Sequence, residues 1–318
     1  MTSLRKGILY YFVFFTVLCV PGKAQYFTKH DSWKKERKEW LFGGGVSNFL
    51  GDLGGLNKVG THYSFADLEM VLTSPSASLG YRYRISKQFA SRTDFSYLIV
   101  KGDDKLTLEK FRHNRNLNFK SNVFEFSTVV ELSLSFNRAG NKYHIKKTLF
   151  RRQKKYNSYY YIFAGVGGFY FNPKANYGGT WYNLHDLSTE GEGLAGGPKQ
   201  YKRVSVSIPL GIGMRFKVSD RWTVGLEFNF RKTFTDYIDD CSGTYYDRAK
   251  LAQLKGPVAA GLADPSLGLI HGATDPNGDG TGAQRGDKRD KDSYMNLQIK
   301  IGYVVKNRKR RRITKAKF

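Results

Sequence analysis

The chain has 318 residues and a formal net charge of +25 at pH 7, from 52 Lys and Arg against 27 Asp and Glu. Its hydrophobic content of 40% excludes a chain that is disordered throughout, and its mean hydropathy of −0.49 excludes a polytopic helical membrane protein. Many Gly, Tyr and Phe beside only 8 Pro favour aromatic β-strands. A positive surplus of this size usually indicates nucleic acid or an anionic surface, so the location of the charge decides its meaning.

Residues 1–24 are predicted to form a secretory signal peptide that is cleaved near Ala24. Arg5 and Lys6 precede an apolar run over 7–20, and small residues stand before the expected cut. The run has about 14 residues, whereas a membrane-spanning helix needs roughly 20. A retained anchor is the alternative. Residues 25–39 are then expected to form a periplasmic N-terminal arm, and export argues against nucleic acid as a partner.

The rest of the chain carries eight runs in which apolar and polar residues alternate. In the clearest run, every second residue from Trp222 to Phe230 is Trp, Val, Leu or Phe, and the residues between are Thr, Gly, Glu and Asn. A period of two residues indicates a β-strand with one apolar face. The predicted strands are 40–47, 79–85, 89–100, 119–136, 159–171, 204–216, 222–230 and 295–303.

The length of these strands favours a transmembrane β-barrel over residues 40–305. Most have about 9–13 residues, whereas strands in soluble proteins have about 5–6 and tilted membrane-spanning strands about 9–11. The even number of strands and the signal peptide point the same way. We therefore predict an all-β fold, an antiparallel outer-membrane barrel of about eight strands with long extracellular loops and both termini in the periplasm. A soluble β-sandwich is the alternative.

Charged residues stand on the less apolar face of several predicted strands, which would turn inward. An eight-stranded barrel is too narrow for an open channel, and a charge confined there is costly unless it is paired. Structural ion pairs are therefore the preferred interpretation, and a proton or ion path is the alternative. The residues expected to point inward are Arg82, Arg84, Glu125, Glu131, Arg215, Glu227, Arg231 and Lys300.

Most of the positive charge of the mature chain falls on the predicted periplasmic side. The connection at 137–158 and the tail at 306–318 each carry a net charge of +8. Two such segments on one side of a barrel would attract an acidic protein, a cell-wall polymer or phospholipid head groups. A periplasmic protein is the preferred partner, and a merely solvated patch is the alternative. The residues predicted to dock the partner are Arg151, Arg152, Lys154, Lys155, Arg308, Lys309, Arg310, Arg311 and Arg312.

The motifs that carry chemistry are weak, and no catalytic residue, metal or cofactor is expected. The histidines lack a His-x-x-x-His spacing, and no Cys-x-x-Cys exists. His185 and Asp239, near the predicted outer rim, leave a rim protease or lipid hydrolase as an alternative. The segment 275–279 resembles half of a calcium loop, but Gly286 stands where a bidentate Glu is required. The long loop 235–293 could also hold another hairpin.

One series of motifs resembles a known family. NFLGDLGG at 48–55 follows the first predicted strand, FNPKA at 171–175 closes the fifth, and IPLGIG at 208–213 lies in the sixth. The most specific motif closes the seventh strand and contains Arg231, Thr235, Asp236, Tyr237, Asp239 and Asp240. In this order, the series resembles the PorG family, the outer-membrane barrel component of the Bacteroidetes type IX secretion and gliding machinery. The resemblance spans about 40–305.

The resemblance implies a non-enzymatic barrel that attaches the periplasmic ring of the lipoprotein PorK and its partner PorN to the outer membrane. It supplies no catalytic residues, and the basic segments 138–155 and 306–318 lie outside the matched motifs. The three motif aspartates are expected to pair with Arg231 or to cap the loop turn, with ligand or partner contact as the alternative. A passive small porin, or an adhesin that uses loop 235–293, is the remaining alternative function.

Overall fold

The computed structural model of the protein describes residues 36–53, 72–134, 158–274 and 282–306. All of these residues belong to one compact unit, Trp33–Phe318. The predicted signal peptide, the calcium-like segment and the nine residues predicted to dock a partner lie outside the described ranges.

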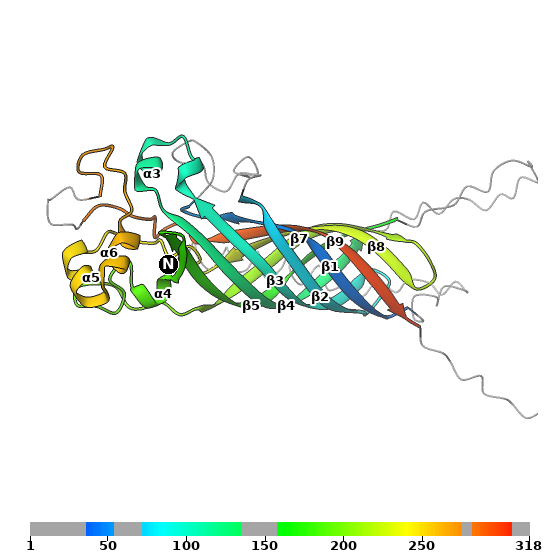
Figure 1. Ribbon diagram of the computed structural model, residues 1–318. Helices are drawn as coiled ribbons and strands as arrows, with labels where there is room; N and C mark the ends of the chain where they lie inside the picture. Colours follow the sequence, from blue (N-terminus) through cyan, green and yellow to red (C-terminus); the bar gives the residue numbers. More distant parts are fainter. Residues whose placement is uncertain (1–35, 54–71, 135–157, 275–281, 307–318) are drawn as a thin grey trace, which may run out of the picture. The chain divides into compact units, whose positions relative to one another are not determined.

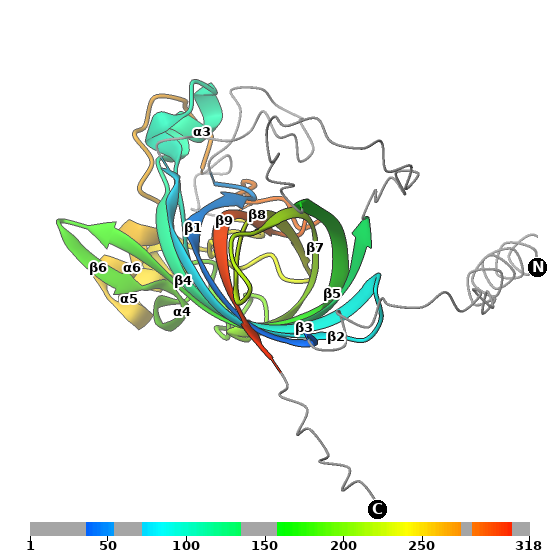
Figure 2. The same ribbon diagram turned by 90° about the vertical axis from the view of Figure 1, so that its right-hand side faces the viewer.

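Eight antiparallel strands form a closed barrel (Figure 1, Figure 2). Strands that follow one another in the barrel pair side by side, and the pairing of β9 with β1 closes the ring. The predicted fold class is therefore confirmed. The wall consists of β1 (Lys38–Leu50), β2 (Ser74–Arg84), β3 (Phe89–Asp103), β4 (Asn118–Leu134), β5 (Ser158–Tyr177), β7 (Val204–Lys217), β8 (Trp222–Thr233) and β9 (Ser293–Val305).

Each of the eight predicted strands has its counterpart in the wall, and most extend further than the alternation indicated. The longest, β5, continues six residues past its predicted end and turns back as the short strand β6 (Thr180–Asn183), which pairs only with β5. The long loop after β8 contains no barrel strand among its described residues. It holds the helices α5 (Arg248–Lys255) and α6 (Pro257–Ala263) instead.

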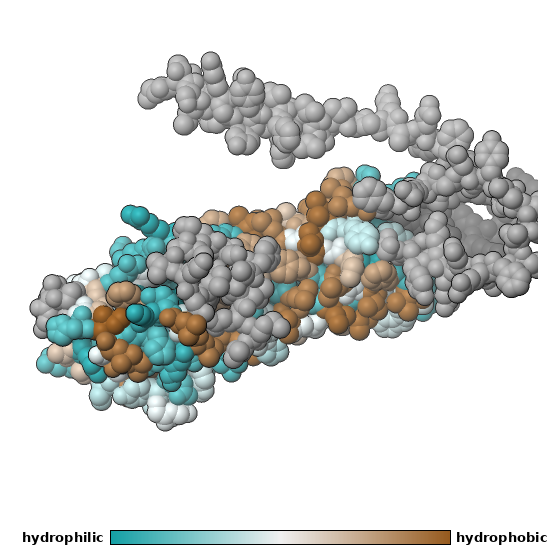
Figure 3. Space-filling model, turned by 90° about the horizontal axis from the view of Figure 1, so that it is seen from above, coloured by the Kyte–Doolittle hydropathy of each residue, from teal (hydrophilic) through white to brown (hydrophobic). Residues whose placement is uncertain are grey.

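The wall is apolar outside and polar inside. Along β8, the residues at even positions from Trp222 to Phe230 face outward, and Thr223, Glu227 and Arg231 are buried inside. Figure 3 shows hydrophobic residues gathered along the barrel wall, whereas the end with the long connections mixes hydrophilic and hydrophobic residues. This inverted arrangement is that of a transmembrane barrel, because lipid replaces water at the outer surface. The most exposed apolar residues of the wall include Phe42, Leu79, Phe95, Phe126, Val166, Val206, Ile212 and Ile299.

Aromatic residues form a belt on the outside of the wall near one end. The rings of Trp40 and Tyr81 lie 5.0 Å apart, as do those of Trp222 and Tyr303. Tyr303 lies opposite both Trp40 and Trp222 in the sheet, so the four rings follow one level across β8, β9, β1 and β2. Aromatic girdles of this kind mark the boundary between lipid and water.

The two ends of the barrel differ in their connections. Tight turns at 85–88 and 218–221 close one end, where the register also places Lys38 opposite Val305. We call this the turn end. Four long connections leave the other end and carry the helices α3 (Lys110–Arg115), α4 (Leu184–Leu187), α5 and α6 (Figure 1). The helices among the described residues are too short or too polar to span a membrane.

We call the described residues of these four connections the loop cap. They are 51–53 with 72–73, 104–117, 178–203, and 234–292 without 275–281. The largest hydrophobic cluster lies where the cap meets the barrel and contains Leu53, Phe119, Phe171 and Ile238. The cap and the barrel end therefore share one packed core, which joins the connections to the wall.

Candidate functional site

Ionised side chains fill the barrel near its turn end. Four cations and four carboxylates lie within one set of ion pairs, so their formal charges balance. All of them are almost fully buried. We call this set the interior network. Its members are Glu39, Arg82, Arg92, Asp94, Glu131, Arg215, Glu227 and Lys300.

Arg92 lies at the centre of the interior network. Its Nε lies 2.7 Å from Asp94 Oδ2 and its Nη1 lies 3.1 Å from Glu131 Oε1. The same guanidinium also binds both carboxylate oxygens of Glu227. Because its exposed fraction is 0%, the three carboxylates are the compensation for its buried charge.

The remaining members extend the network to the opposite wall. Lys300 Nζ lies 2.9 Å from Glu227 Oε1, and Tyr161 donates a hydrogen bond to Glu227 Oε2 at 2.8 Å. Arg82 bridges Glu39 and Glu131. Gly302 makes the approach of Glu39 possible, because a Cβ at this position would collide with the Glu39 carboxylate.

A second polar group lies nearer the loop cap. Arg231 forms an ion pair with Glu125 and donates through Nη1 to Asn296 Oδ1 at 2.7 Å. Tyr294 donates to Glu125 Oε2 at 2.9 Å, and its ring lies under the Arg231 guanidinium. Arg231 is therefore fully engaged inside the barrel, and the expected pairing of Arg231 with the motif aspartates is not formed.

The sequence located most of the inward charges but not the central one. Seven of the eight expected residues are buried inside the wall, and Arg84 is half-buried near the turn end. Arg92 and Asp94 were not among them, although both lie on the predicted strand 89–100 at positions that alternate with Phe89, Ser91 and Phe95. Strict use of the two-residue period would have found them.

The loop cap is organised around the buried side chain of Arg285. Its Nη1 lies 3.1 Å from Glu190 Oε1 and also donates to the main-chain oxygen of Asp240, and its Nε donates to the Ala263 oxygen at 3.3 Å. Glu190 in turn accepts the main-chain N–H groups of Ser242 and Gly243. One arginine thereby joins the connection after β5 to both halves of the connection after β8.

The motif aspartates hold turns of the loop cap. Asp239 accepts the N–H of Cys241 at 3.0 Å and that of Leu53 at 3.3 Å. Asp240 accepts the hydroxyl groups of Thr189 and Tyr201, the latter at 2.6 Å. Asp239 thus caps the turn, whereas Asp240 joins the turn to the connection after β5.

The other motif residues lie in the same turn. Thr235 accepts the N–H of Asp292 at 3.0 Å, and Tyr237 stacks on Tyr201 with ring centroids 4.5 Å apart. Asp236 is different: it is buried and accepts no main-chain N–H group of the described residues, and its ion pair with Lys291 is long, with Nζ 3.8 Å from Oδ2. The motif therefore combines two aspartates that accept short hydrogen bonds with one whose charge is only weakly compensated.

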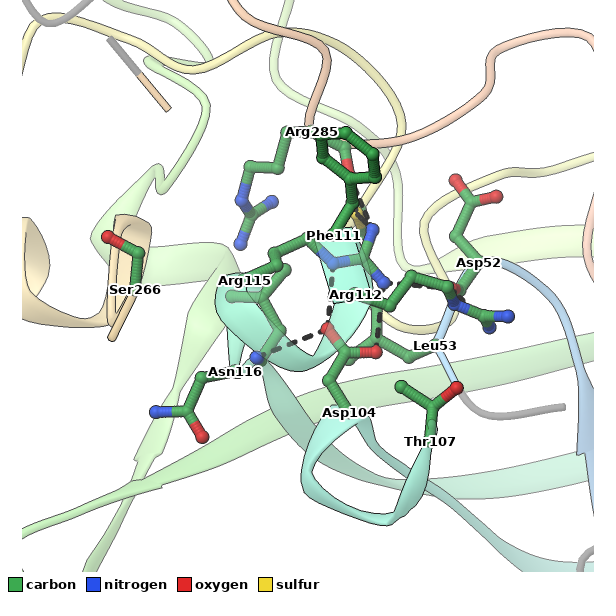
Figure 4. A network of polar contacts seen from close by, with 12 residues as sticks. Asp52, Leu53, Asp104, Thr107, Phe111, Arg112, Arg115, Asn116, Ser266 and Arg285 are labelled. Atoms are coloured by element: carbon green, nitrogen blue, oxygen red, sulfur yellow. Dashed lines mark hydrogen bonds and ion pairs between the residues drawn. The ribbon is translucent and has the colours of Figure 1, made fainter. Parts of the chain in front are cut away.

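Arg115 on α3 joins the connection after β3 to the rest of the cap (Figure 4). Its guanidinium lies 2.7 Å from Asp104 Oδ2 and donates to the main-chain oxygens of Asp52, at 2.8 Å, and Arg285, at 2.6 Å. Arg115 and Arg285 are thus connected directly, and all four connections share one polar framework.

Carboxylates outnumber arginines in this framework, and burial changes their protonation. Burial raises the pKa of Asp52 to about 7, of Asp236 and Asp240 to about 6, and of Glu192 to about 8. Burial also raises the pKa values of Asp239 and Asp292, each with further contributions from neighbouring carboxylates. The buried carboxylates of the cap are Asp104, Glu190, Glu192, Asp236, Asp239, Asp240 and Asp292.

His185 and Asp239, which the sequence left as an alternative hydrolase site at the rim, do not contact each other through a hydrogen bond. His185 lies 3.2 Å from Asp186 Oδ1 through Nδ1 and 3.1 Å from the Tyr201 main-chain oxygen through Nε2. Asp239 is engaged with main-chain N–H groups instead, and no hydrogen bond between the described residues joins it to His185. Within the described ranges, no group of three or more His, Cys, Asp or Glu residues is arranged to hold a metal ion.

Comparison with known proteins identifies one matching family model and several solved structures of low sequence identity. The family model described as a domain of unknown function, DUF6089, matches residues 37–255. No curated protein matches the chain. Among solved structures, Neisserial surface protein A (NspA) is similar at 7% identity and a TM-score of 0.34, over 84% of this chain and 96% of that one.

Two further structures are similar at the same level. The attachment invasion locus protein Ail of Yersinia pestis has 9% identity and a TM-score of 0.35, over 84% of this chain and 98% of its own. The outer membrane protein AlkL has 10% identity and a TM-score of 0.32, over 90% and 97%. Likenesses this distant carry no argument about function. Since the family model covers more than half of the chain, the protein belongs to the DUF6089 family.

Proposed function

We propose that the protein is a non-enzymatic outer-membrane barrel that anchors or assembles the periplasmic ring of the type IX secretion and gliding machinery. The motif series from 48 to 240 and its resemblance to PorG suggest this role. The observation that carries it is the position at which two basic segments leave the barrel.

Both segments depart from the turn end. The connection 135–157 begins after β4 and ends before β5, and Ser133 donates its N–H to the oxygen of Gln88 in the first tight turn. The tail begins after β9, where Lys306 Nζ lies 3.0 Å from Asp220 in the second tight turn. Outer-membrane barrels keep their short turns in the periplasm, so both segments are available to a periplasmic partner.

The barrel interior favours a structural role over a pore. The interior network is balanced in charge, almost fully buried and held in ion pairs, and an eight-stranded barrel is too narrow for an open channel. We expect no conductance from the purified protein in planar bilayers. Stable single-channel currents would favour the small porin instead.

The decisive experiment is co-purification of the full-length protein from outer membranes after cross-linking. Changing the nine predicted docking residues at 151–155 and 308–312 to Gln should remove the ring lipoprotein from the purified complex and reduce export of type IX cargo. A control carries Gln at exposed loop lysines such as Lys199, Lys250 and Lys288. Unchanged recovery of the ring with the nine-residue variant would overturn the docking role.

A further inference from the structure

Three lysines form a row across the outside of the barrel near the loop cap. Lys101 on β3 lies directly opposite Lys120 on β4, and Lys120 lies directly opposite Lys174 on β5. Their neighbours along the strands, Val100 and Phe119 among them, are buried on the inner side, so the three lysines face outward. We call these residues the lysine row; Figure 1 shows the three strands side by side.

The row is unfavourable for the isolated protein. Side chains directly opposite each other in a sheet have Cβ atoms about 5 Å apart, and like charges in such pairs destabilise the sheet. None of the three lysines forms an ion pair with a described carboxylate. The nearest acidic residue on the same face of β3, Asp103, accepts the N–H of Lys105 and thereby caps the following turn.

Other groups around the row extend the cationic surface. Arg203 lies beside β5, with its guanidinium over the Tyr170 ring and Nη1 3.5 Å from Asn172 Oδ1. Lys120 Nζ lies 5.8 Å from the ring centroid of Trp181 on β6, which is 48% exposed. A ligand at the row would therefore meet cations, amides and one exposed indole ring.

The position of the row along the barrel axis can be compared with the apolar band of the wall. Tyr97, Phe124 and Tyr170 lie opposite one another on the same face, four residues closer to the middle of the wall. Four residues of strand span about 13 Å, or roughly 10 Å along a tilted barrel axis. The lysines therefore stand just beyond the apolar band, at the depth of lipid head groups, on the end with the long connections.

We propose that the lysine row binds the phosphate groups of a phosphorylated glycolipid in the outer leaflet of the membrane. Ammonium groups suit phosphate as point charges, and a bound phosphate replaces the repulsion between the lysines with attraction. The acyl chains would lie against the aromatic and aliphatic residues below the row, and the sugar would lie near Trp181. The proposal rests on the membrane orientation proposed above, not on the role in secretion.

The test uses the full-length mature protein in zwitterionic micelles and diphosphorylated lipid A as the probe, with binding followed by native mass spectrometry. The triple variant Lys101→Gln, Lys120→Gln, Lys174→Gln should bind lipid A on the order of a hundredfold more weakly, since each lysine near an anionic lipid surface contributes a factor of about five. Lipid A without phosphates should bind the unchanged protein as weakly as lipid A binds the variant.

Two further variants keep the test specific. The triple variant with Arg at the same positions retains the charges and should retain binding. A control that removes three exposed loop lysines, Lys199→Gln, Lys250→Gln and Lys288→Gln, should bind like the unchanged protein. Because the lysine row is repulsive without lipid, its Gln variant should be at least as resistant to urea in lipid-free micelles.

Several results would overturn the proposal. Equal binding of lipid A by the Gln variant, equal losses in the loop control, or tight binding of dephosphorylated lipid A would each do so. Inorganic phosphate that binds as tightly as lipid A would indicate a free-anion site instead of a lipid site. The Gln variant should still co-purify the periplasmic ring, so that failure of lipid binding and failure of the proposed function are distinguishable.

Discussion

The barrel interior and the loop cap are both rich in buried charge, but they compensate it differently. Inside the barrel, four cations face four carboxylates, and Arg92 alone contacts three of the carboxylates. In the cap, seven carboxylates are buried around the arginines Arg285 and Arg115, and main-chain N–H groups and hydroxyl groups supply most of the compensation. The stability of the interior should therefore depend most on each ion-pair partner, and the stability of the cap should depend most on pH.

The difference has a topological origin. Strands in a closed barrel direct every second side chain into a narrow space, where opposite charges from different strands meet and few main-chain groups are free. The connections of the cap are irregular, so their N–H groups are available to carboxylates such as Glu190 and Asp239.

Removing Arg92 should have the largest effect. The variant Arg92→Met leaves three buried carboxylates without their shared cation, and we expect a loss of about 3–5 kcal/mol in the free energy of unfolding. Urea titration of the refolded barrel in micelles measures the loss. The exposed turn residue Lys87, changed to Met, is the control. A loss below about 1 kcal/mol would show that the interior network does not depend on charge balance.

Removing Arg285 should destabilise the cap and leave the barrel intact. The variant Arg285→Met loses hydrogen bonds to Glu190, Asp240 and Ala263, and we expect a local loss of about 2–3 kcal/mol. Hydrogen exchange at Ser242 and Gly243, whose N–H groups bind Glu190, reports this loss.

The barrel control for this variant is exchange at strand amides, which should not change. Arg289, exposed in the same connection, can be changed to Met as the matched variant. If the whole barrel unfolds together with the cap, the two regions form one cooperative unit and the comparison between them fails.

The cap should lose stability as the pH rises. Raised pKa values mean that the folded cap binds more protons than the unfolded chain between about pH 4 and pH 8, so the free energy of unfolding falls through this window and levels off above it. We expect a change on the order of 1–2 kcal/mol between pH 5 and pH 8. Urea titrations followed by NMR at the Ile238 and Cys241 amides measure it. Rising cap stability over this range would contradict the protonation of the cap.

The smallest effect is expected at Asp236. Because its ion pair with Lys291 is long and partly exposed, Asp236→Asn removes a buried charge and loses only a weak partner, and stability at pH 8 should rise by up to about 1 kcal/mol. The matched change Asp239→Asn should instead destabilise the cap, because Asp239 accepts two main-chain N–H groups. Equal responses of the two variants in urea titrations would show that hydrogen bonding does not distinguish them.

The barrel could be predicted from the sequence because its determinants are periodic. Alternation located all eight wall strands, and it placed charges such as Glu131 and Glu227 inside. It missed Glu39, which stands one residue before the predicted start of the first strand, since β1 begins at Lys38. A strand end has too few neighbours to show a period of two.

The loop cap could not be predicted in the same way. Its contacts join residues far apart in the chain, such as Asp52 and Asp287, which are 235 positions apart, and its segments have no common period. The motif at 235–240 lies within the polar framework of the cap. Its sequence did not indicate that Asp239 would accept the N–H of Leu53 or that Arg231 would pair with Glu125 inside the barrel. Only the folded connections bring these groups together.

The pairing of β1 with β9 has a consequence for biogenesis. Lys38 lies opposite Val305, so the ring closes only after the last strand of the chain has arrived. Until then β1 has an edge of unpaired N–H and C=O groups, which lipid cannot satisfy and which invites pairing with other chains. A chain shortened before β9 could therefore never seal its edge. We expect such products to aggregate or to be degraded in the periplasm rather than to persist as smaller barrels.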